Sequence, residues 1–238
     1  MKIIAHFSPN FNEKKRPIDS IKILVIHYTG MQSERESIIR LSDPKFEVSS
    51  HFVISQNGKI YRLVQDNKIA WHAGKSCWGK YRNLNKNSIG IELVNKGHQF
   101  GYTYFKKKQI SSLIRLCKNL IKKYKIKIIV GHSDIAPLRK KDPGEKFPWN
   151  KLYKNNIGIW YKKSKFKSKD RDENKLEKLF FKNLFRIGYR YFSKKRRSKN
   201  DIFLIKAFQR RFLLSNVTGK IDQKTYKISY FLAKRVKN

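Results

Sequence analysis

Two short apolar runs that each lead into a histidine constrain the fold of this chain more than any other feature. The first, IKILVIHY at residues 21–28, carries His27 near its end; the second, IKIIV at 126–130, is followed by a glycine and His132. Both runs are rich in β-branched residues and too short for typical helices, so they indicate buried β-strands. The sequence therefore predicts a sheet in which a histidine stands at the end of two strands.

The pattern between these runs alternates between strands and helices. We expect a short helix at 34–42, a hairpin in 49–64 around Asn57-Gly58, and a strand at 87–94. The segment 106–124 is predicted to be an amphipathic helix, because its apolar residues recur on one face: Ile110, Leu113, Ile114, Cys117, Leu120 and Ile121. This mixture indicates an α/β domain over about residues 20–155, with a mixed central β-sheet flanked by helices.

The composition changes after residue 161. Residues 162–175, KKSKFKSKDRDENK, have little to bury and read as a polar linker or as the polar start of a helix. Residues 176–238 then show helical spacing of large apolar side chains, and Asp222 is a candidate cap for the last helix. We therefore expect a larger domain at 1–161 and a small three-helix domain at 176–238.

The charge of the chain is extreme, at +39 for 238 residues. Such a field favours anionic partners, which include nucleic acid, an acidic membrane surface and a carboxylate-bearing polymer such as peptidoglycan. Free use of lysine at exposed positions explains the charge equally well, so charge alone does not identify a ligand. Cys77 and Cys117 have no C-x-x-C spacing, which argues against a disulfide framework, and Cys117 fits a helix core. No apolar run has the length of a signal peptide core or a membrane span, so we expect neither.

A third polar residue completes a candidate metal site. Asp142 lies in the turn Asp-Pro-Gly shortly after His132. A catalytic zinc needs three nitrogen or oxygen ligands on rigid elements and one open position, and His27, His132 and Asp142 are such a set. Spacing alone leaves a structural role for each histidine open.

Five blocks of the sequence together resemble one family. They are ILVIHYTG, SSHFVISQNGKIYRLV, IAWHAG, NKNSIGIELVN and GHSDIAPLRKKDPGEKFPW. In order and spacing they resemble the N-acetylmuramoyl-L-alanine amidase type 2 family, whose fold is shared with T7-type lysozymes and peptidoglycan recognition proteins. The likeness covers about residues 20–155 and is greatest to the branch of the recycling and lipoprotein amidases. It implies one Zn²⁺ per chain, held by His27, His132 and Asp142.

The resemblance also implies catalytic side chains. Glu92 matches the general base of this branch, and Lys140 matches the lysine that stabilises charge on the carbonyl oxygen, with Lys141 as a rival. Ser50 stands where another branch has a catalytic tyrosine, which favours Glu92 as the base. His51 is expected to be structural.

Further residues in the matching blocks are candidates for binding substrate. Trp71, His72, Ala73 and Gly74 are expected to form a wall of the substrate groove, since aromatic rings and an accessible backbone suit sugar and peptide ligands. Asn83 and Asn87 lie in the polar loop before the strand of Glu92. They are interpreted as stem-peptide ligands, with turn formation as the alternative.

The C-terminal segment resembles the peptidoglycan-binding domain type 1. The matching residues are Ala207, Gln209, Phe212, Val217, Thr218, Gly219, Asp222 and Thr225. Such a domain implies tethering to wall polymer, and the basic stretch 182–199 would add attraction to wall carboxylates. It favours a periplasmic or wall-associated location over a cytoplasmic one.

Together these features predict a zinc amidase of peptidoglycan turnover or recycling. The reaction is hydrolysis of the bond between the lactyl group of MurNAc, or its 1,6-anhydro form, and L-Ala of the stem peptide. The expected partners are peptidoglycan or muropeptides, and no nucleic acid. Two alternatives remain: a non-catalytic peptidoglycan-recognition protein, and a basic nucleic-acid-binding protein without a recognised motif.

Overall fold

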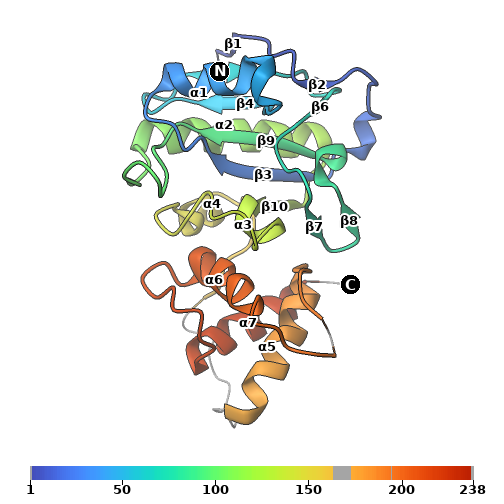
Figure 1. The fold of residues 1–238 in the computed structure, drawn as a ribbon, viewed down its shortest axis with the longest axis vertical. Coiled ribbons are helices and arrows are strands. Elements are labelled where there is room, and N and C mark those ends of the chain that lie inside the picture. Colours follow the sequence, from blue (N-terminus) through green and yellow to red (C-terminus); the bar gives the residue numbers. More distant parts are fainter. Residues whose placement is uncertain (1, 163–172, 194, 237–238) are drawn as a thin grey trace.

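A mixed β-sheet forms the centre of the larger domain (Figure 1). The computed structural model describes residues 2–162, 173–193 and 195–236. The strand order is β1-β5-β4-β9-β3-β10. Their bounds are Ile4–Ala5 (β1), Ile23–Tyr28 (β3), Phe52–Ile54 (β4), Ile60–Arg62 (β5), Ser88–Leu93 (β9) and Ile128–Gly131 (β10). Strands β4, β9, β3 and β10 are parallel, whereas β5 is antiparallel to β4 and parallel to β1. The predicted α/β class and mixed sheet are confirmed.

Helices and short strands surround this sheet (Figure 1). The helices of the larger domain are α1 (Glu34–Ser42), α2 (Lys107–Tyr124), α3 (His132–Ile135) and α4 (Trp149–Lys154), with 3₁₀ turns at Ile18–Ser20, Pro44–Phe46 and Leu84–Asn87. Two short ribbons pair β2 (Phe11–Asn12) with β6 (Ile69–Ala70) and β7 (Cys77–Trp78) with β8 (Tyr81–Arg82). Among the described helices, none combines the length and apolar character needed to cross a membrane.

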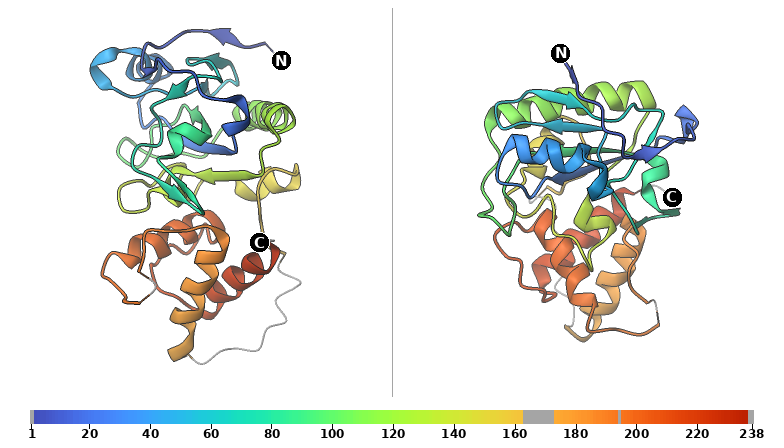
Figure 2. Two further views of the ribbon diagram at one scale, coloured as in Figure 1. Left: turned by 90° about the vertical axis from the view of Figure 1, so that its right-hand side faces the viewer. Right: turned by 45° about the horizontal axis from the view of Figure 1, so that its top comes forward.

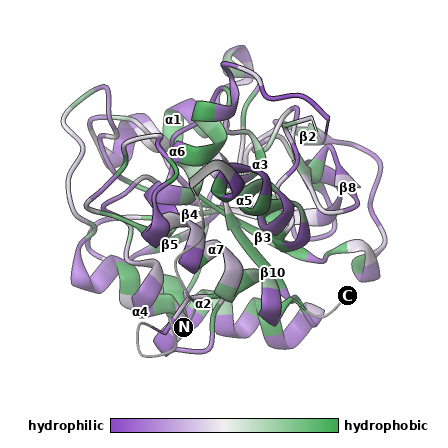
Figure 3. Ribbon diagram, turned by 90° about the horizontal axis from the view of Figure 1, so that it is seen from below, coloured by the Kyte–Doolittle hydropathy of each residue, from purple (hydrophilic) through white to green (hydrophobic). Residues whose placement is uncertain are grey.

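The two faces of strand β3 belong to different cores. Leu24 and Ile26 pack in the cluster that contains the apolar face of α2, whereas Ile23 and Val25 pack toward the C-terminal domain. Because side chains alternate along a strand, His27 lies on the same face as Ile23 and Val25. Seen from below, β3 and β10 are coloured mainly as hydrophobic (Figure 3). The histidine is thus a polar residue carried by the buried face of a central strand.

The predicted hairpin exists, but its turn is wider than the Asn-Gly signal suggested. Strands β4 and β5 pair antiparallel, and the connection between them runs over residues 55–59. Of Asn57 and Gly58, only Gly58 has a positive φ, of 90°. The side chain of Asn57 instead accepts the backbone N–H of Lys59, so it stabilises the turn through its amide oxygen.

Within the described residues after 172, the C-terminal domain has three helices, as predicted: α5 (Glu173–Ile187), α6 (Asp201–Phe212) and α7 (Gln223–Arg235). Most of the expected linker, residues 163–172, lies outside the described residues, and α5 already begins at Glu173. Asp222 caps α7 by accepting the N–H of Thr225 at 2.7 Å. The buried side chain of Gln209 accepts the N–H of Gly219 and donates to the carbonyl of Lys220, so it holds the turn before α7.

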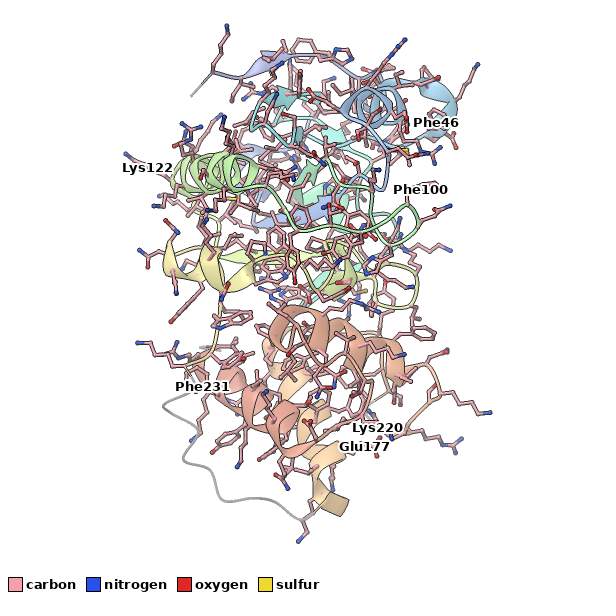
Figure 4. The ribbon with its side chains drawn as sticks, turned by 90° about the vertical axis from the view of Figure 1, so that its left-hand side faces the viewer. Phe46, Phe100, Lys122, Glu177, Lys220 and Phe231 are labelled. Atoms are coloured by element: carbon pink, nitrogen blue, oxygen red, sulfur yellow. The ribbon has the colours of Figure 1, made fainter. Side chains whose placement is uncertain are left out.

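The C-terminal domain packs against the edge of the sheet at which β10 lies (Figures 1 and 2). Side chains fill the junction, and Glu177 and Lys220 lie in the half of the molecule away from the sheet (Figure 4). Helix α7 returns to the larger domain, where Arg235 donates to the hydroxyl of Tyr153 on α4 at 3.2 Å. One shared core therefore joins the two domains.

Candidate metal centre

The three predicted metal ligands lie together in the structure. Nδ1 of His27 is 3.0 Å from both Nδ1 of His132 and Oδ2 of Asp142, and the last two atoms are 3.2 Å apart. All three side chains are buried. His27 thus joins two residues that follow it by more than a hundred positions, and the three present one compact set of donor atoms.

Sheet register explains why the histidines meet. Strands β3 and β10 are parallel neighbours, and Gly131 of β10 pairs with Ile26 of β3. The residue that follows each member of this pair is a histidine, His132 after Gly131 and His27 after Ile26. A Cβ at Gly131 would lie 2.6 Å from Cδ of Pro143, so only glycine allows the Asp142 loop to approach. The N–H of Ser133 donates to the carbonyl of Asp142 at 2.8 Å and fixes that loop.

The donor set fits a tetrahedral zinc ion. Bonds of about 2.0–2.1 Å at tetrahedral angles place ligand atoms about 3.3 Å apart, close to the separations seen here. Glu92 adds a second observation: its carboxylate is buried, Oε1 lies 4.0 Å from Nδ1 of His27, and Oε2 has no hydrogen-bond partner. A buried carboxylate oxygen without a partner is costly, so its position beside the cluster indicates a functional role.

A chain of hydrogen bonds sets the tautomer of His27. The hydroxyl of Ser88 donates to the carbonyl of Leu84 at 2.6 Å, and it therefore accepts from Nε2 of His72 at 3.1 Å. Nδ1 of His72 is then free to accept from Nε2 of His27, at 3.1 Å. This arrangement leaves the lone pair on Nδ1 of His27 directed at the metal position, as a ligating imidazole requires.

Gly90 makes this chain possible. A Cβ at Gly90 would lie 2.5 Å from the ring of His72, so the glycine on β9 leaves the space that the ring occupies. His132 is oriented in a similar way, because its Nε2 donates to the carbonyl of Ala73 at 3.2 Å. Arg139 also donates to that carbonyl. Both histidine ligands thus have their outer nitrogen fixed by the protein.

Burial determines the charge of the site. Desolvation lowers the pKa of His27 to about 4, so the ring is neutral near pH 7. Burial alone would raise the pKa of Asp142, but His132 and His27 beside it hold that pKa well below its usual value. Burial, together with the negative charge of Asp142, raises the pKa of Glu92 well above its usual value. His27 and Asp142 are thus in the forms that bind a metal, and Glu92 is a stronger base than an ordinary carboxylate.

The two candidate lysines occupy different places. The positive charge of Lys140 acts on both His27 and Glu92, whose pKa values it lowers. Lys141 lines a pocket at the junction with the C-terminal domain. Of the two lysines, Lys140 is therefore the one whose charge reaches His27 and Glu92, whereas Lys141 lines the pocket at the domain junction.

Several of the predicted groove residues have other positions. His72 is buried behind His27, and Ala73 is fully buried, so neither side chain lines a groove; the ring of His72 and the backbone carbonyl of Ala73 instead contact the two histidines of the cluster. Asn87 donates to the carbonyl of Ser20 at the amino end of β9. At about 3.3 Å per residue it lies about 16 Å along the strand from Glu92, too far to bind a peptide at the metal.

The remaining groove candidates are half-buried (Trp71) or exposed (Gly74 and Asn83). The indole of Trp71 donates to Asn12 at 2.8 Å, and Gly74 has a positive φ of 55°, where an added Cβ would lie 3.0 Å from the guanidinium of Arg139. Asn83 is exposed and opens the 3₁₀ turn before β9, which agrees with the turn alternative. His51 is fully buried, and its Nδ1 accepts the N–H of Gly90, as expected of a structural histidine.

Sequence reasoning missed the residues that hold the site from outside. Asn85 accepts the backbone N–H groups of both His72 and Ala73, at 3.2 and 2.7 Å. Ser88 fixes the tautomer of His72. An asparagine in a polar loop and a serine at a strand start carry no distinctive sequence signal, and only their three-dimensional partners reveal these roles.

Comparisons with known proteins agree with this geometry. Residues 15–145 match the family model described as N-acetylmuramoyl-L-alanine amidase. The chain is 46% identical to the amidase AmiD of Escherichia coli over 154 residues, which are 59% of this chain and 55% of AmiD. It thus spans about half the length of that relative. It is 36% identical to the 1,6-anhydro-N-acetylmuramyl-L-alanine amidase AmpD of Haemophilus influenzae, over 60% of this chain and 86% of AmpD.

Two solved structures resemble nearly the whole chain. One is E. coli AmiD in complex with the substrate anhydro-N-acetylmuramic acid-L-Ala-D-γ-Glu-L-Lys, with a TM-score of 0.81, 33% identity, and coverage of 94% of this chain and 92% of that one. The other is AmpDH3 of Pseudomonas aeruginosa, with a TM-score of 0.79, 30% identity and 94% coverage of each chain. Both likenesses extend over the C-terminal helices as well as the sheet.

Proposed function

The chain belongs to the N-acetylmuramoyl-L-alanine amidase family, and from this premise we propose that it hydrolyses the amide bond between the lactyl group of MurNAc and L-Ala of the stem peptide. The sugar is either MurNAc or its 1,6-anhydro form, the form in the substrate complex of AmiD. The observation that carries the proposal is the cluster of three ligand atoms with the unpaired carboxylate oxygen of Glu92 beside it. A non-catalytic recognition protein would have no need for that base.

We propose Zn²⁺ as the metal, one per chain. His27, His132 and Asp142 would hold it through two nitrogens and one oxygen. When bound, zinc supplies Lewis acidity, which polarises a carbonyl and lowers the pKa of water. Three protein ligands leave one tetrahedral position open, the pattern of catalytic rather than structural zinc sites.

Glu92 is the proton carrier in this proposal. Its raised pKa lets it take a proton from the attacking water and still release that proton later. As the water oxygen bonds to the lactyl carbonyl carbon, one proton passes to Glu92. When the carbon–nitrogen bond breaks, Glu92 gives this proton to the alanine nitrogen, so the products are a carboxylic acid and a free amine.

Lys140 would stabilise the negative charge that develops on the carbonyl oxygen. Its charge already acts on Glu92 and His27 across the site. A fixed positive charge near a developing oxyanion stabilises the transition state more than the ground state. Lys140 therefore contributes to kcat more than to substrate affinity.

Product analysis tests the proposed function. Mass spectrometry of reactions with intact sacculi and with anhydro-muropeptides should detect free peptides that begin with L-Ala. Asp142→Ala should abolish their release and lower the zinc content below one per chain. Asp19→Ala, which removes an exposed carboxylate of the 3₁₀ turn before β3, is the matched control and should behave as wild type. Release of peptides by a zinc-free preparation would refute the metal assignment.

We also propose a role and a location for the C-terminal domain. Its Gln209-centred turn is consistent with the peptidoglycan-binding motif, and its basic surface suits a polymer that carries carboxylates. Such a domain favours a periplasmic or wall-associated enzyme over a cytoplasmic one. Cosedimentation of the full chain with purified sacculi, and fractionation of cells, test these two proposals separately.

A further inference from the structure

Asp142 differs from the two histidines of the metal cluster in the element that carries it. His27 lies on β3 and His132 begins α3, whereas Asp142 lies in the loop between α3 and α4. A functional side chain on a loop is held less precisely than one on a helix or strand, so its position depends on the contacts of that loop. The N–H of Ser133 holds the carbonyl of Asp142. The next carbonyl along the loop, that of Pro143, is held by a side chain from a different segment.

That side chain is Tyr102, in the connection between β9 and α2. Its hydroxyl donates to the carbonyl of Pro143 at 2.6 Å and accepts the N–H of Lys146 at 3.0 Å. The Nζ of Lys146 donates in turn to the carbonyl of Tyr102 at 2.6 Å and lies 5.2 Å from the centre of its ring. Tyr102 is thus bonded to the loop at the residue directly after Asp142 and again at Lys146.

Gly144 leaves the space for this contact. A Cβ at Gly144 would lie 2.5 Å from the hydroxyl oxygen of Tyr102 and 2.7 Å from Cζ of its ring, so a larger residue would force the two segments apart. Gly144 also has a positive φ of 81°, which glycine adopts without strain. The sequence Asp-Pro-Gly at 142–144 therefore supplies the candidate ligand, the carbonyl that Tyr102 binds and the space for its ring.

Aromatic neighbours fix Tyr102 in turn. Its ring stacks on that of His98, with the ring centroids 4.5 Å apart, and lies 5.6 Å from the ring of Tyr28. Nδ1 of His98 is 2.8 Å from the hydroxyl of Tyr28, and its Nε2 is 3.1 Å from Oε2 of Glu145. Tyr28 directly follows His27 on β3. The segment that carries Tyr102 therefore contacts the end of β3 as well as the loop that follows the third ligand.

We propose that Tyr102 is a positioning residue for the metal centre, which holds the carboxylate of Asp142 in place through the carbonyl of Pro143. The inference rests on the proposed function, because it concerns a ligand of the metal assigned there. Loss of a group that orients a metal ligand from outside typically weakens metal binding by about 10- to 100-fold. Tyr102 acts on the backbone beside Asp142 and not on its carboxylate, so we expect the lower end of this range.

The test measures metal binding by the full-length protein. Competition with a chromophoric chelator gives the Kd for Zn²⁺, and the visible spectrum of the Co²⁺-loaded protein reports the ligands and their geometry. Tyr102→Phe removes only the hydroxyl, so it should raise the Kd for Zn²⁺ about 10-fold and alter the Co²⁺ spectrum. A Kd and a spectrum identical to those of wild type would overturn the positioning role.

Tyr124→Phe is the matched control. The hydroxyl of Tyr124 donates to Asp66 at 2.5 Å, a bond outside the metal cluster and its loop. Its loss should destabilise the same domain and leave both the Kd for Zn²⁺ and the Co²⁺ spectrum unchanged. If Tyr124→Phe weakened zinc binding as much as Tyr102→Phe, the effect would reflect general stability and the proposal would be wrong.

Lys146→Met gives a second reading if Tyr102→Phe does not fold. It removes the donor to the carbonyl of Tyr102. Loss of a positive charge by itself favours a bound cation, so weaker zinc binding by Lys146→Met would support the positioning role, and equal or tighter binding would overturn it. A wild-type protein that binds neither metal would refute the metal assignment of the proposed function, and the positioning role with it.

Discussion

The buried ion pair between the domains gives the sharpest prediction on stability. Arg211 of α6 donates to Oδ2 of Asp134 on α3 at 2.5 Å and to the carbonyl of Ile129 at 2.9 Å, and its side chain is 3% exposed. Arg211→Met keeps an unbranched stem of similar width but removes the guanidinium with its charge and N–H donors. Asp134 would then be a buried carboxylate that retains two donors, the hydroxyl of Tyr189 at 2.6 Å and the N–H of Gly131 at 2.8 Å.

The cost of this change can be worked out from those contacts. Removing one partner of a buried pair costs about 3–5 kcal/mol, and the two donors left on Asp134 favour the lower end, about 3 kcal/mol. The unpaired carbonyl of Ile129 adds about 1 kcal/mol. The total of about 4 kcal/mol corresponds to a fall in Tm of roughly 8–16 °C for a chain of this length.

Thermal and urea unfolding, followed by circular dichroism, measure this cost. Arg211→Met with Asp134→Asn should be less destabilised than the sum of the single variants by about 1–3 kcal/mol, because neither charge is then left alone. Arg115→Met is the exposed control and should change stability by less than about 0.5 kcal/mol. The reasoning would be refuted if Arg211→Met lowered the free energy of unfolding by less than about 1 kcal/mol. It would also be refuted if the destabilisation disappeared at high salt, because salt screens exposed ion pairs but not buried ones.

Three further predictions follow from the site and the core. Glu92→Gln should lower kcat by about 10²–10⁴-fold with the zinc content unchanged, as measured by peptide release and metal analysis; unaltered turnover would exclude Glu92 as the base. Gly90→Ala should force the ring of His72 away from His27 and cost about 1–3 kcal/mol, with weaker zinc retention in a chelator titration; full retention would contradict the relay of hydrogen bonds. Burial alone would raise the pKa of Asp66, but the hydroxyl of Tyr124 and nearby cations lower it below its usual value. The ionised carboxylate therefore stabilises the folded state at every pH above its unfolded pKa of about 4. This contribution is lost as the pH falls through the lower pKa of the folded state. Tyr124→Phe should therefore reduce stability at pH 7 by about 1.5–3 kcal/mol and flatten the acid limb of urea midpoints against pH, whereas parallel curves would argue against it.

The three candidate metal-binding residues, which the structure brings together, could be singled out from the sequence because each stands at a strongly patterned position. His27 and His132 end runs of β-branched residues, and Asp142 lies in a turn signalled by proline and glycine. These local signals fix where each residue lies on its own element. The parallel pairing of β3 with β10, which brings the histidines together, follows only from the complete fold.

The supporting residues could not be predicted, because their roles depend on which end or face of an element they occupy. Asn87 and Asn85 lie in the same polar loop, yet one binds Ser20 at the amino end of the sheet and the other holds the segment beside the metal ligands. His72 reads as a groove residue, but the space left by Gly90 lets its ring pack behind His27. A backbone gap of this kind has no signature in composition or periodicity.

Two consecutive arginines of α6 lie at the junction with the larger domain and differ in what they contact. Arg211 reaches Asp134, which accepts the N–H of Gly131 directly before the ligand His132, so it acts on the position of a ligand. Arg210 instead lines a pocket at the junction of the two domains, whose other wall includes Lys141 and Glu145 of the larger domain. Tethering to wall polymer would require neither contact, because a flexible linker would suffice. The two contacts therefore argue that the C-terminal helices are part of the catalytic unit, and that separating the domains would impair cleavage of small soluble muropeptides as well as of the polymer.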